Sequence, residues 1–208
     1  MWGMKKKEPV LINHNHSHRL KYKICVSGAA ETGHCGPEAL EQAEAIGREI
    51  ARHGLVLVTG ATTGIPYWAA KGAKAEGGIV IGLSPAASKA AHIKTYRLPT
   101  DYHDLIIYTG FEYSGRNLLL TRASDAVIVL CGRVGTLNEF TIAFEDEKPI
   151  GILEGPWSTD DIIHDIINKG HRGQGKVVFA KKPEELVNKL LALIESEEAK
   201  NGIKGRVL

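Results

Sequence analysis

The sequence AVIVLCGRVGTLNEFTIAFE, from Ala126 to Glu145, contains an apolar run, a glycine-rich turn and a helical pattern in that order. Ala126–Leu130 has no polar residue, as is typical of a strand in a parallel sheet that is covered on both faces. Gly132–Gly135 predicts a loop, and Thr136–Glu145 has the spacing of a helix. A strand that runs through a glycine loop into a helix is the repeating unit of an α/β fold.

The same alternation continues on both sides of this unit. Short apolar runs are separated by segments in which apolar residues recur every three or four positions, as they do on one face of a helix. We therefore predict an α/β fold, a Rossmann-like, doubly wound and mostly parallel sheet of about seven strands with helices on both faces. The predicted strands are Lys21–Val26, Leu55–Val58, Ile79–Leu83, Leu105–Tyr108, Ala126–Leu130, Pro149–Leu153 and Lys176–Ala180.

The pattern covers residues 21–200, and we predict a single domain there because no linker rich in Pro, Gly or Ser divides it. Residues 1–20 are predicted to be a flexible N-terminal extension and residues 201–208 a C-terminal tail. His14, His16 and His18 alternate in the extension. We interpret them as part of a solvated segment rather than a metal site, because no acidic or cysteine residue lies beside them.

Positive and negative charges are nearly balanced. The chain of 208 residues has 26 Lys and Arg against 24 Asp and Glu, a net charge of +2, which disfavours a protein that coats nucleic acid. No apolar run approaches the ~20 residues that span a bilayer. The basic segment Met1–Lys7 is followed by polar residues rather than by the apolar centre of a signal peptide. We therefore predict a cytoplasmic protein that binds neither membranes nor nucleic acid.

The three cysteines, Cys25, Cys35 and Cys131, are an odd number without a CxxC pair. This pattern disfavours a disulfide framework and a four-cysteine zinc site, so we expect reduced thiols. We expect Cys131, at the end of a predicted strand, to be a small buried residue rather than a reactive thiol. Nothing in the sequence indicates a bound metal or a cofactor.

Four loops are predicted to lie at the carboxyl edge of the sheet, where open parallel sheets bind ligands. They are Ser27–Gly36, Thr59–Ile65, Thr109–Arg116 and Cys131–Thr136. Glycines let the backbone approach a ligand, and helix N-termini add a partial positive charge, so such loops suit a phosphate. The chain lacks GxGxxG after the first strand, GxxxxGK(S/T) and GxSxG, which disfavours an ordinary NAD enzyme, a P-loop nucleotide triphosphatase and a hydrolase triad.

The segment after the fifth predicted strand resembles the P-G-G-x-G-T-x-x-E signature of the LOG-type nucleotide phosphoribohydrolases, which are also labelled lysine decarboxylases. The matching positions are Gly132, Gly135, Thr136 and Glu139. Cys131 replaces the proline of the signature and Arg133 its second glycine. The resemblance extends from about Lys21 to Leu153, and Arg116-Asn117 falls where many members have Arg-Lys.

This resemblance implies that Glu139 and Arg116 cleave the N-glycosidic bond of a nucleoside 5′-monophosphate, without a cofactor, to a free base and ribose 5-phosphate. A carboxylate beside C1′ stabilises the positive charge that builds on the sugar ring. The resemblance also implies a homodimer or a higher homo-oligomer. The residues that we predict to bind the phosphate or the rest of a nucleotide-like ligand are Ser27, Gly28, Gly60, Thr63, Gly64, Gly132, Arg133, Val134, Gly135 and Thr136.

Two other functions stay open on the sequence. Relatives of this fold carry molybdenum cofactor, so the chain also fits a non-catalytic carrier of a nucleotide or of that cofactor. The fold is similar to the core of a DNA-uptake protein, which adds a DNA-processing alternative that the balanced charge disfavours. Arg133 either points into solvent or lines the pocket as a cation for a larger anionic ligand, and we favour the inward or rim-lining position.

Overall fold

Each apolar run that the sequence predicted to be a strand forms one in the computed structural model, which describes residues 20–202. The strands are β1 (Lys23–Ser27), β2 (Val56–Thr59), β3 (Ile79–Ser84), β4 (Leu105–Tyr108), β5 (Ala126–Val129), β6 (Ile150–Leu153) and β7 (Val177–Ala180). All pair in parallel in one seven-stranded sheet of order β4-β3-β2-β1-β5-β6-β7. The predicted doubly wound α/β fold is confirmed.

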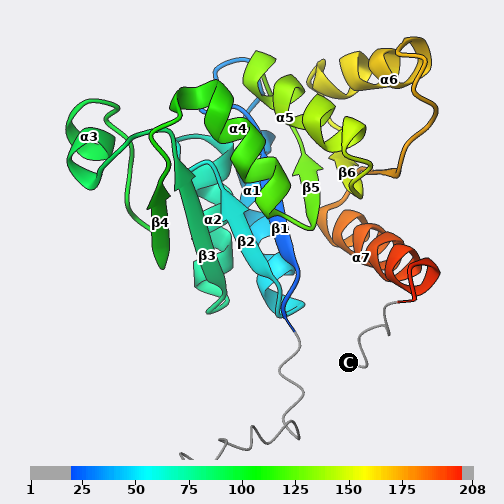
Figure 1. Ribbon diagram of the computed structural model, residues 1–208, viewed down its shortest axis with the longest axis horizontal. Helices are drawn as coiled ribbons and strands as arrows, with labels where there is room; N and C mark the ends of the chain where they lie inside the picture. The colour runs from blue at the N-terminus through cyan, green and yellow to red at the C-terminus, as the bar shows by residue number, and fades with distance from the viewer. Residues whose placement is uncertain (1–19, 203–208) are drawn as a thin grey trace, which may run out of the picture.

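Helices cover both faces of the sheet (Figure 1). They are α1 (Glu38–Arg52), α2 (Ile65–Ala75), α3 (Lys89–Lys94), α4 (Glu112–Ala123), α5 (Val134–Glu145), α6 (Thr159–Lys169) and α7 (Pro183–Lys200). Helices α1, α2 and α7 pack on one face, and α4, α5 and α6 pack on the other. The short α3 lies apart, beyond the β4 edge in Figure 1.

Two hydrophobic cores follow from the alternation of side chains along each strand. Ile24 and Val26 of β1 point into the core under α1, α2 and α7, whereas Cys25 points into the core under α4, α5 and α6. In β5, Ile128 belongs to the first core and Val129 to the second. Because both faces of these strands are buried, apolar residues can follow one another along them. These apolar runs are the sequence pattern from which the strands were predicted.

The chain reverses direction across the sheet between β4 and β5. It adds β2, β3 and β4 outward on one side of β1, and then returns to place β5 on the other side of β1. The chain after β1 therefore continues into α1 on one face, while the chain after β5 continues into α5 on the opposite face. Diverging loops of this kind open a crevice at the carboxyl edge, where ligands bind in such folds.

A disulfide between Cys35 and Cys131 corrects the prediction of reduced thiols. The two residues are 96 positions apart, but the loops that contain them meet at the switch between β1 and β5, where their Cα atoms are 5.6 Å apart. Cys131 is buried, as predicted, while Cys25 is the buried free thiol. Reduced thiols would have supported a reducing compartment, and the disulfide removes that support.

Residues 1–19 and 203–208 lie outside the described part of the chain, and with them His14, His16, His18 and most of the two predicted terminal segments. Within residues 20–202, no helix has the length and apolar character that crossing a membrane requires.

Candidate functional site

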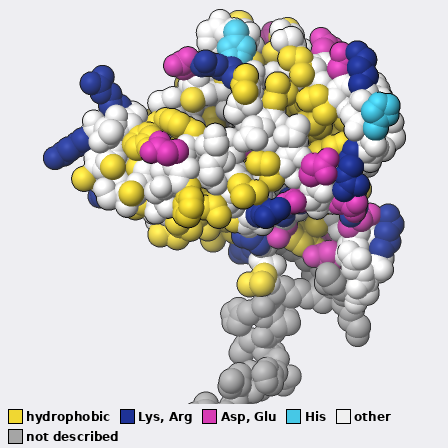
Figure 2. Space-filling model, turned by 45° about the horizontal axis from the view of Figure 1, so that its top comes forward, with side chains coloured by type: hydrophobic (Ala, Val, Ile, Leu, Met, Phe, Trp, Pro, Cys, Tyr) yellow, Lys and Arg dark blue, Asp and Glu magenta, His cyan; other side chains and the backbone are white. Residues whose placement is uncertain are grey.

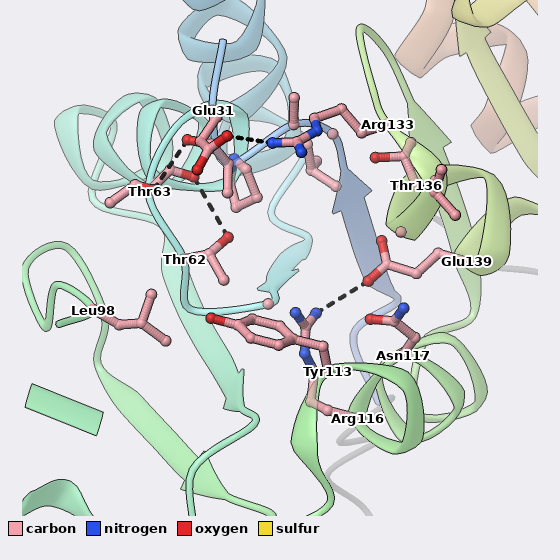
Figure 3. Close-up of a pocket in the computed structure, with 18 of the residues that line it drawn as sticks. Glu31, Thr62, Thr63, Leu98, Tyr113, Arg116, Asn117, Arg133, Thr136 and Glu139 are labelled. Carbon is pink, nitrogen blue, oxygen red and sulfur yellow. Dashed lines mark hydrogen bonds and ion pairs between the residues drawn. The ribbon is translucent and has the colours of Figure 1, made fainter. Parts of the chain in front are cut away.

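The carboxyl edge of the sheet is hollowed by a cavity of about 580 Å³ at the switch point. Its walls come from the loops after β1 and β2, from the connection between α3 and β4, and from the first turns of α4 and α5 (Figure 3). The predicted site residues that line it are Gly28, Gly60, Thr63, Arg116, Arg133, Val134, Gly135, Thr136 and Glu139. The fold thus brings together most of the residues that the sequence singled out.

A buried ion pair lies in the floor of the cavity. Nη1 of Arg116, in the second turn of α4, donates to Oε1 of Glu139, in the second turn of α5, at 3.0 Å (Figure 3). The exposed fractions of the two side chains are only 6% and 8%. The hydroxyl of Ser27, at the end of β1, donates to the other carboxylate oxygen of Glu139. Three elements therefore position one carboxyl group.

Opposing effects act on the ionisation of Glu139. Burial raises the pKa of its carboxyl above the ordinary value, because the charged form loses its hydration. The Arg116 guanidinium and the hydrogen bond from Ser27 both favour the charged form and lower the pKa, but burial is the largest effect. The carboxyl can therefore exchange a proton at a higher pH than a surface glutamate does.

Gly60 makes room for the guanidinium of Arg116. A Cβ atom on Gly60 would overlap Nη1, Cζ and Nη2 of Arg116, so the arginine lies directly against the backbone after β2. Nε of Arg116 is buried and has no hydrogen-bond partner among the described residues. A buried donor that is left without a partner is energetically costly, because its hydration is lost and not replaced.

Asn117 adds a third donor to Glu139. The two ends of its amide are assigned from the surrounding hydrogen bonds. With its nitrogen toward Glu139, the amide donates to Oε1 at 2.9 Å and to the carbonyl oxygen of Tyr113 at 2.9 Å. Asn117 thus replaces the cation that the related family often has at this position with a neutral hydrogen-bond donor.

The N-terminus of α5 faces the cavity. The helix begins at Val134, two residues before the predicted start, because the second half of the predicted loop is already helical. Val134, Gly135 and Thr136 are its first three residues, and amides in a first turn have no partner within the helix. Free amides and the positive end of a helix dipole are the features that attract anions at helix N-termini in general.

Arg133 lies at the rim of the cavity, the position that we favoured from the sequence, and pairs with Glu31 of the β1–α1 loop (Figure 3). Both side chains stay largely exposed, at 56% and 82%. The backbone of Arg133 is extended, with φ −125°, so a side chain is accommodated here without left-handed geometry. An exposed pair of this kind contributes little stability and is open to exchange with a charged ligand.

Three predicted residues do not line the cavity but shape its walls. Ser27 reaches it through Glu139. Gly64 has φ +68° and lies against the carbonyl oxygens of Ala29 and Ala30, so no side chain fits there. Gly132 packs against the side chain of Thr136, and its amide donates to Oγ1 of Thr159 at 2.8 Å. The two glycines thus act through packing.

The wall formed by the connection between α3 and β4 was not predicted from the sequence. Tyr96, Arg97 and Leu98 line the cavity, and the ring of Tyr96 meets that of Tyr113 edge to face at 5.8 Å. The hydroxyl of Tyr96 donates to Glu112 at 2.6 Å. The one available signal was the long interval between the predicted strands Ile79–Leu83 and Leu105–Tyr108, because long connections in compact domains are often functional.

The fold and the cavity define a Rossmann-like α/β protein with a helix N-terminus and a buried acid–arginine pair in a cavity at the switch point. The sequence matches the profile of the SLOG cluster4 family over residues 21–187, and the chain belongs to this family. It is 31% identical over 166 residues to an uncharacterized protein of Archaeoglobus fulgidus, a match that covers 80% of this chain and 94% of that protein.

A second relative has a named activity. The chain is 34% identical over 148 residues to the cytokinin riboside 5′-monophosphate phosphoribohydrolase of Mycobacterium tuberculosis, with 67% of this chain and 74% of that protein covered. The expected similarity to the LOG-type family is therefore confirmed.

Solved structures of two other kinds share the fold. The molybdenum cofactor binding protein of Rippkaea orientalis has a TM-score of 0.70 and 30% identity, and the match covers 86% of this chain and 99% of that one. The DNA processing protein A of Helicobacter pylori has a TM-score of 0.61, with 82% and 80% covered. At 19% identity, this second likeness shows the fold alone.

The contact between Ser27 and Glu139 gives a test of the electrostatics. Ser27→Ala removes a donor to the carboxylate, so we expect the pKa of Glu139 to rise further above its ordinary value. Carbon-13 NMR of the labelled glutamate carboxyl across a pH titration measures the midpoint. Ser158→Ala, at an exposed serine that makes no side-chain cap, is the matched control and leaves the midpoint unchanged. Equal midpoints in all three proteins would contradict the assignment.

Proposed function

We propose that the cavity binds a nucleotide-like phosphorylated small molecule and that Glu139 and Arg116 hydrolyse its N-glycosidic bond. The products are a free base and ribose 5-phosphate. The observation that carries this proposal is the buried Arg116–Glu139 pair beside the open N-terminus of α5. An anion site and a carboxylate within one cavity are what the hydrolysis of a nucleoside 5′-monophosphate requires.

The phosphate is assigned to the first turn of α5. The amides of Val134, Gly135 and Thr136 and the hydroxyl of Thr136 offer donors to its oxygens, and the helix dipole adds a partial positive charge. Arg133 at the rim supplies a full cation that a ligand phosphate can share with Glu31. No metal or cofactor enters the proposed reaction.

Glu139 acts where the positive charge develops. As the bond from C1′ to the base nitrogen breaks, its electron pair leaves with the base and the sugar becomes electron-poor. The ionised carboxylate of Glu139 stabilises that charge and orients the water whose oxygen bonds to C1′. One proton of this water is taken up by the departing base. Arg116 favours the ionised form of the carboxylate through the ion pair, in opposition to the effect of burial.

The far wall suits the base. Tyr96, Leu98 and Tyr113 add aromatic and apolar surface to the cavity lining, and Leu98 lies on the side opposite Thr136 and Glu139 (Figure 3). Ligand pockets of ~300–1,000 Å³ are usual for small molecules, and the volume of about 580 Å³ falls in this range. The wall therefore supports a ligand with a flat ring opposite its phosphate.

A carrier function is the second candidate. It is supported by the likeness to the molybdenum cofactor binding protein of Rippkaea orientalis, which covers nearly the whole of that chain. Arg133, where the related signature has glycine, favours a larger or more anionic ligand than a simple monophosphate. In this alternative the same residues hold the ligand, and no bond is broken.

The test of the reaction is Glu139→Gln. A neutral amide cannot stabilise the cationic sugar, so we expect turnover to fall by a factor of ~100 or more while binding is retained. Chromatography of free base released from each common nucleoside monophosphate measures turnover, and calorimetry measures binding.

Glu145→Gln, at an exposed position on the same helix, is the control and keeps the wild-type rate. Wild-type kinetics in Glu139→Gln would remove Glu139 from the mechanism. Tight binding without release of any base by the wild-type protein would favour the carrier.

The phosphate position is tested by Thr136→Val, which keeps the shape of the side chain and deletes its hydroxyl. We expect affinity for the phosphorylated ligand to fall by ~1–2 kcal/mol, or about 5- to 30-fold. Thr141→Val removes a hydroxyl that bonds to Asn138 on the same helix and leaves affinity unchanged. If the two variants bind alike in calorimetry, the phosphate lies elsewhere.

Self-association is the proposed partnership. Leu105 and Ile107 of the edge strand β4 and Phe111 beside it are 54%, 47% and 63% exposed, and apolar side chains gather on the molecular face drawn in Figure 2. An exposed apolar edge favours association. We expect Leu105→Lys to lower the mass measured by sedimentation equilibrium, whereas Ile162→Lys, on α6, does not. A monomeric wild-type protein would contradict this proposal.

A further inference from the structure

A second group of ligating side chains lies where the β1–α1 loop meets the start of the α5 loop. His34, Cys35 and Cys131 have ligand atoms that all lie within 4.8 Å of one another. The two cysteines are fully buried and joined as a disulfide, whereas His34 is exposed. Nε2 of His34 lies 3.7 Å from Sγ of Cys35 and 3.2 Å from the carbonyl oxygen of Gly132.

Two cysteine thiolates and a histidine, the groups that these residues offer when reduced, are a ligand set for zinc. Zn²⁺ takes cysteine sulfur at ~2.3 Å and histidine nitrogen at ~2.1 Å with tetrahedral angles, which puts a sulfur and a nitrogen ligand about 3.5 Å apart. The Nε2–Sγ distance of 3.7 Å between His34 and Cys35 is close to that value. The Cα atoms of Cys35 and Cys131, 5.6 Å apart, allow both sulfurs to reach one ion.

We propose that reduction of the Cys35–Cys131 disulfide turns this group into a zinc site with His34 as the third ligand. A dithiol reductant supplies two electrons and two protons, the sulfur–sulfur bond breaks, and the reductant leaves as its own disulfide. Zn²⁺ then bonds to the two sulfurs and to Nε2 of His34, and the two thiol protons are released to solvent. The hydrogen bond from Nε2 of His34 to Gly132 is given up for the metal bond: Nε2 loses its proton to solvent and Nδ1 takes one up, so the neutral ring binds the ion.

The surroundings leave a fourth position open. A hollow of about 350 Å³ borders the group and is lined by His34, Gly132 and Thr159, among others. Water can therefore complete the coordination from this side, as it does at zinc sites with three protein ligands. Oγ1 of Thr159 also donates to the carbonyl of Gly132 at 3.2 Å, which holds the loop in place whether or not the disulfide is present.

The consequence is a redox-dependent choice between two cross-links. The disulfide joins the β1–α1 loop to the residue before Gly132 in the oxidised protein, and the metal ion joins the same two segments in the reduced protein. Neither state uses Glu139 or Arg116. The test of the zinc site therefore does not depend on whether the hydrolase or the carrier function is correct.

The experiment is a Co²⁺ titration of the full chain. One sample is reduced with a phosphine that is then removed under argon, and a second sample stays oxidised. We expect a sulfur-to-cobalt charge-transfer band that saturates at one ion per chain in the reduced sample only, and that Zn²⁺ abolishes. His14, His16 and His18 are replaced by alanine in both samples, so that these histidines contribute no Co²⁺ binding to the comparison.

Variants identify the ligands. In this background, His34→Ala weakens Co²⁺ binding by about tenfold or more, the least expected for a lost ligand, and Cys131→Ser removes most of the band. His171→Ala, at another exposed histidine, and Cys25→Ser, at the buried free cysteine, leave binding unchanged. Circular dichroism checks the fold of each protein.

A reduced, folded protein without the charge-transfer band would overturn the proposal. The disulfide would then be a structural cross-link only. The same conclusion follows if His34→Ala binds Co²⁺ as tightly as its parent. His34 is on the surface, so this variant decides the question even if Cys131→Ser does not fold.

Discussion

The parallel direction of all strands is the constraint on which the site depends. It brings the carboxyl end of every strand to the same edge, and with it every loop that enters a helix N-terminus. The return of the chain to place β5 beside β1 then sends neighbouring loops to opposite faces. The cavity, the disulfide and the ion pair all lie at this one position. A different strand order with the same elements would separate them.

Burial removes the charged groups of Arg116 and Glu139 from water, and neighbouring groups offset this loss of hydration. A buried charge loses several kcal/mol of hydration, which close pairing and added hydrogen bonds offset. Arg116 supplies the pairing for Glu139, and donors from Ser27 and Asn117 satisfy the carboxylate further. Gly60 contributes by having no side chain. A buried ion pair is weak evidence that its residues stabilise the fold. Perturbed ionisable groups such as the Glu139 carboxyl are more often found at functional sites.

Glycines near the cavity act in two distinct ways. Gly28, Gly64 and Gly132 allow close packing, because a Cβ atom at each would overlap the side chain of Ile65, backbone oxygens or Thr136. Gly135 has nothing within 4 Å of an added Cβ and leaves the first turn of α5 accessible. Glycine therefore permits close packing of the cavity wall at the first three positions and keeps the start of α5 accessible at Gly135.

The buried strands, the order of elements and the loops of the carboxyl edge were determined by the sequence, because hydrophobic periodicity and glycine placement are local. The family resemblance of the segment from Gly132 to Glu139 pointed to Glu139 and, outside that segment, to Arg116. The start of α5 was predicted two residues late, since glycine and valine in a first turn look like loop.

Only the tertiary structure decided the partners. The disulfide between Cys35 and Cys131, the wall from Tyr96 to Leu98, and the contact of Gly60 with Arg116 join residues far apart in the chain. Spacing along a sequence carries no information about such contacts, because they depend on which strands become neighbours and on the exact path of the loops between them.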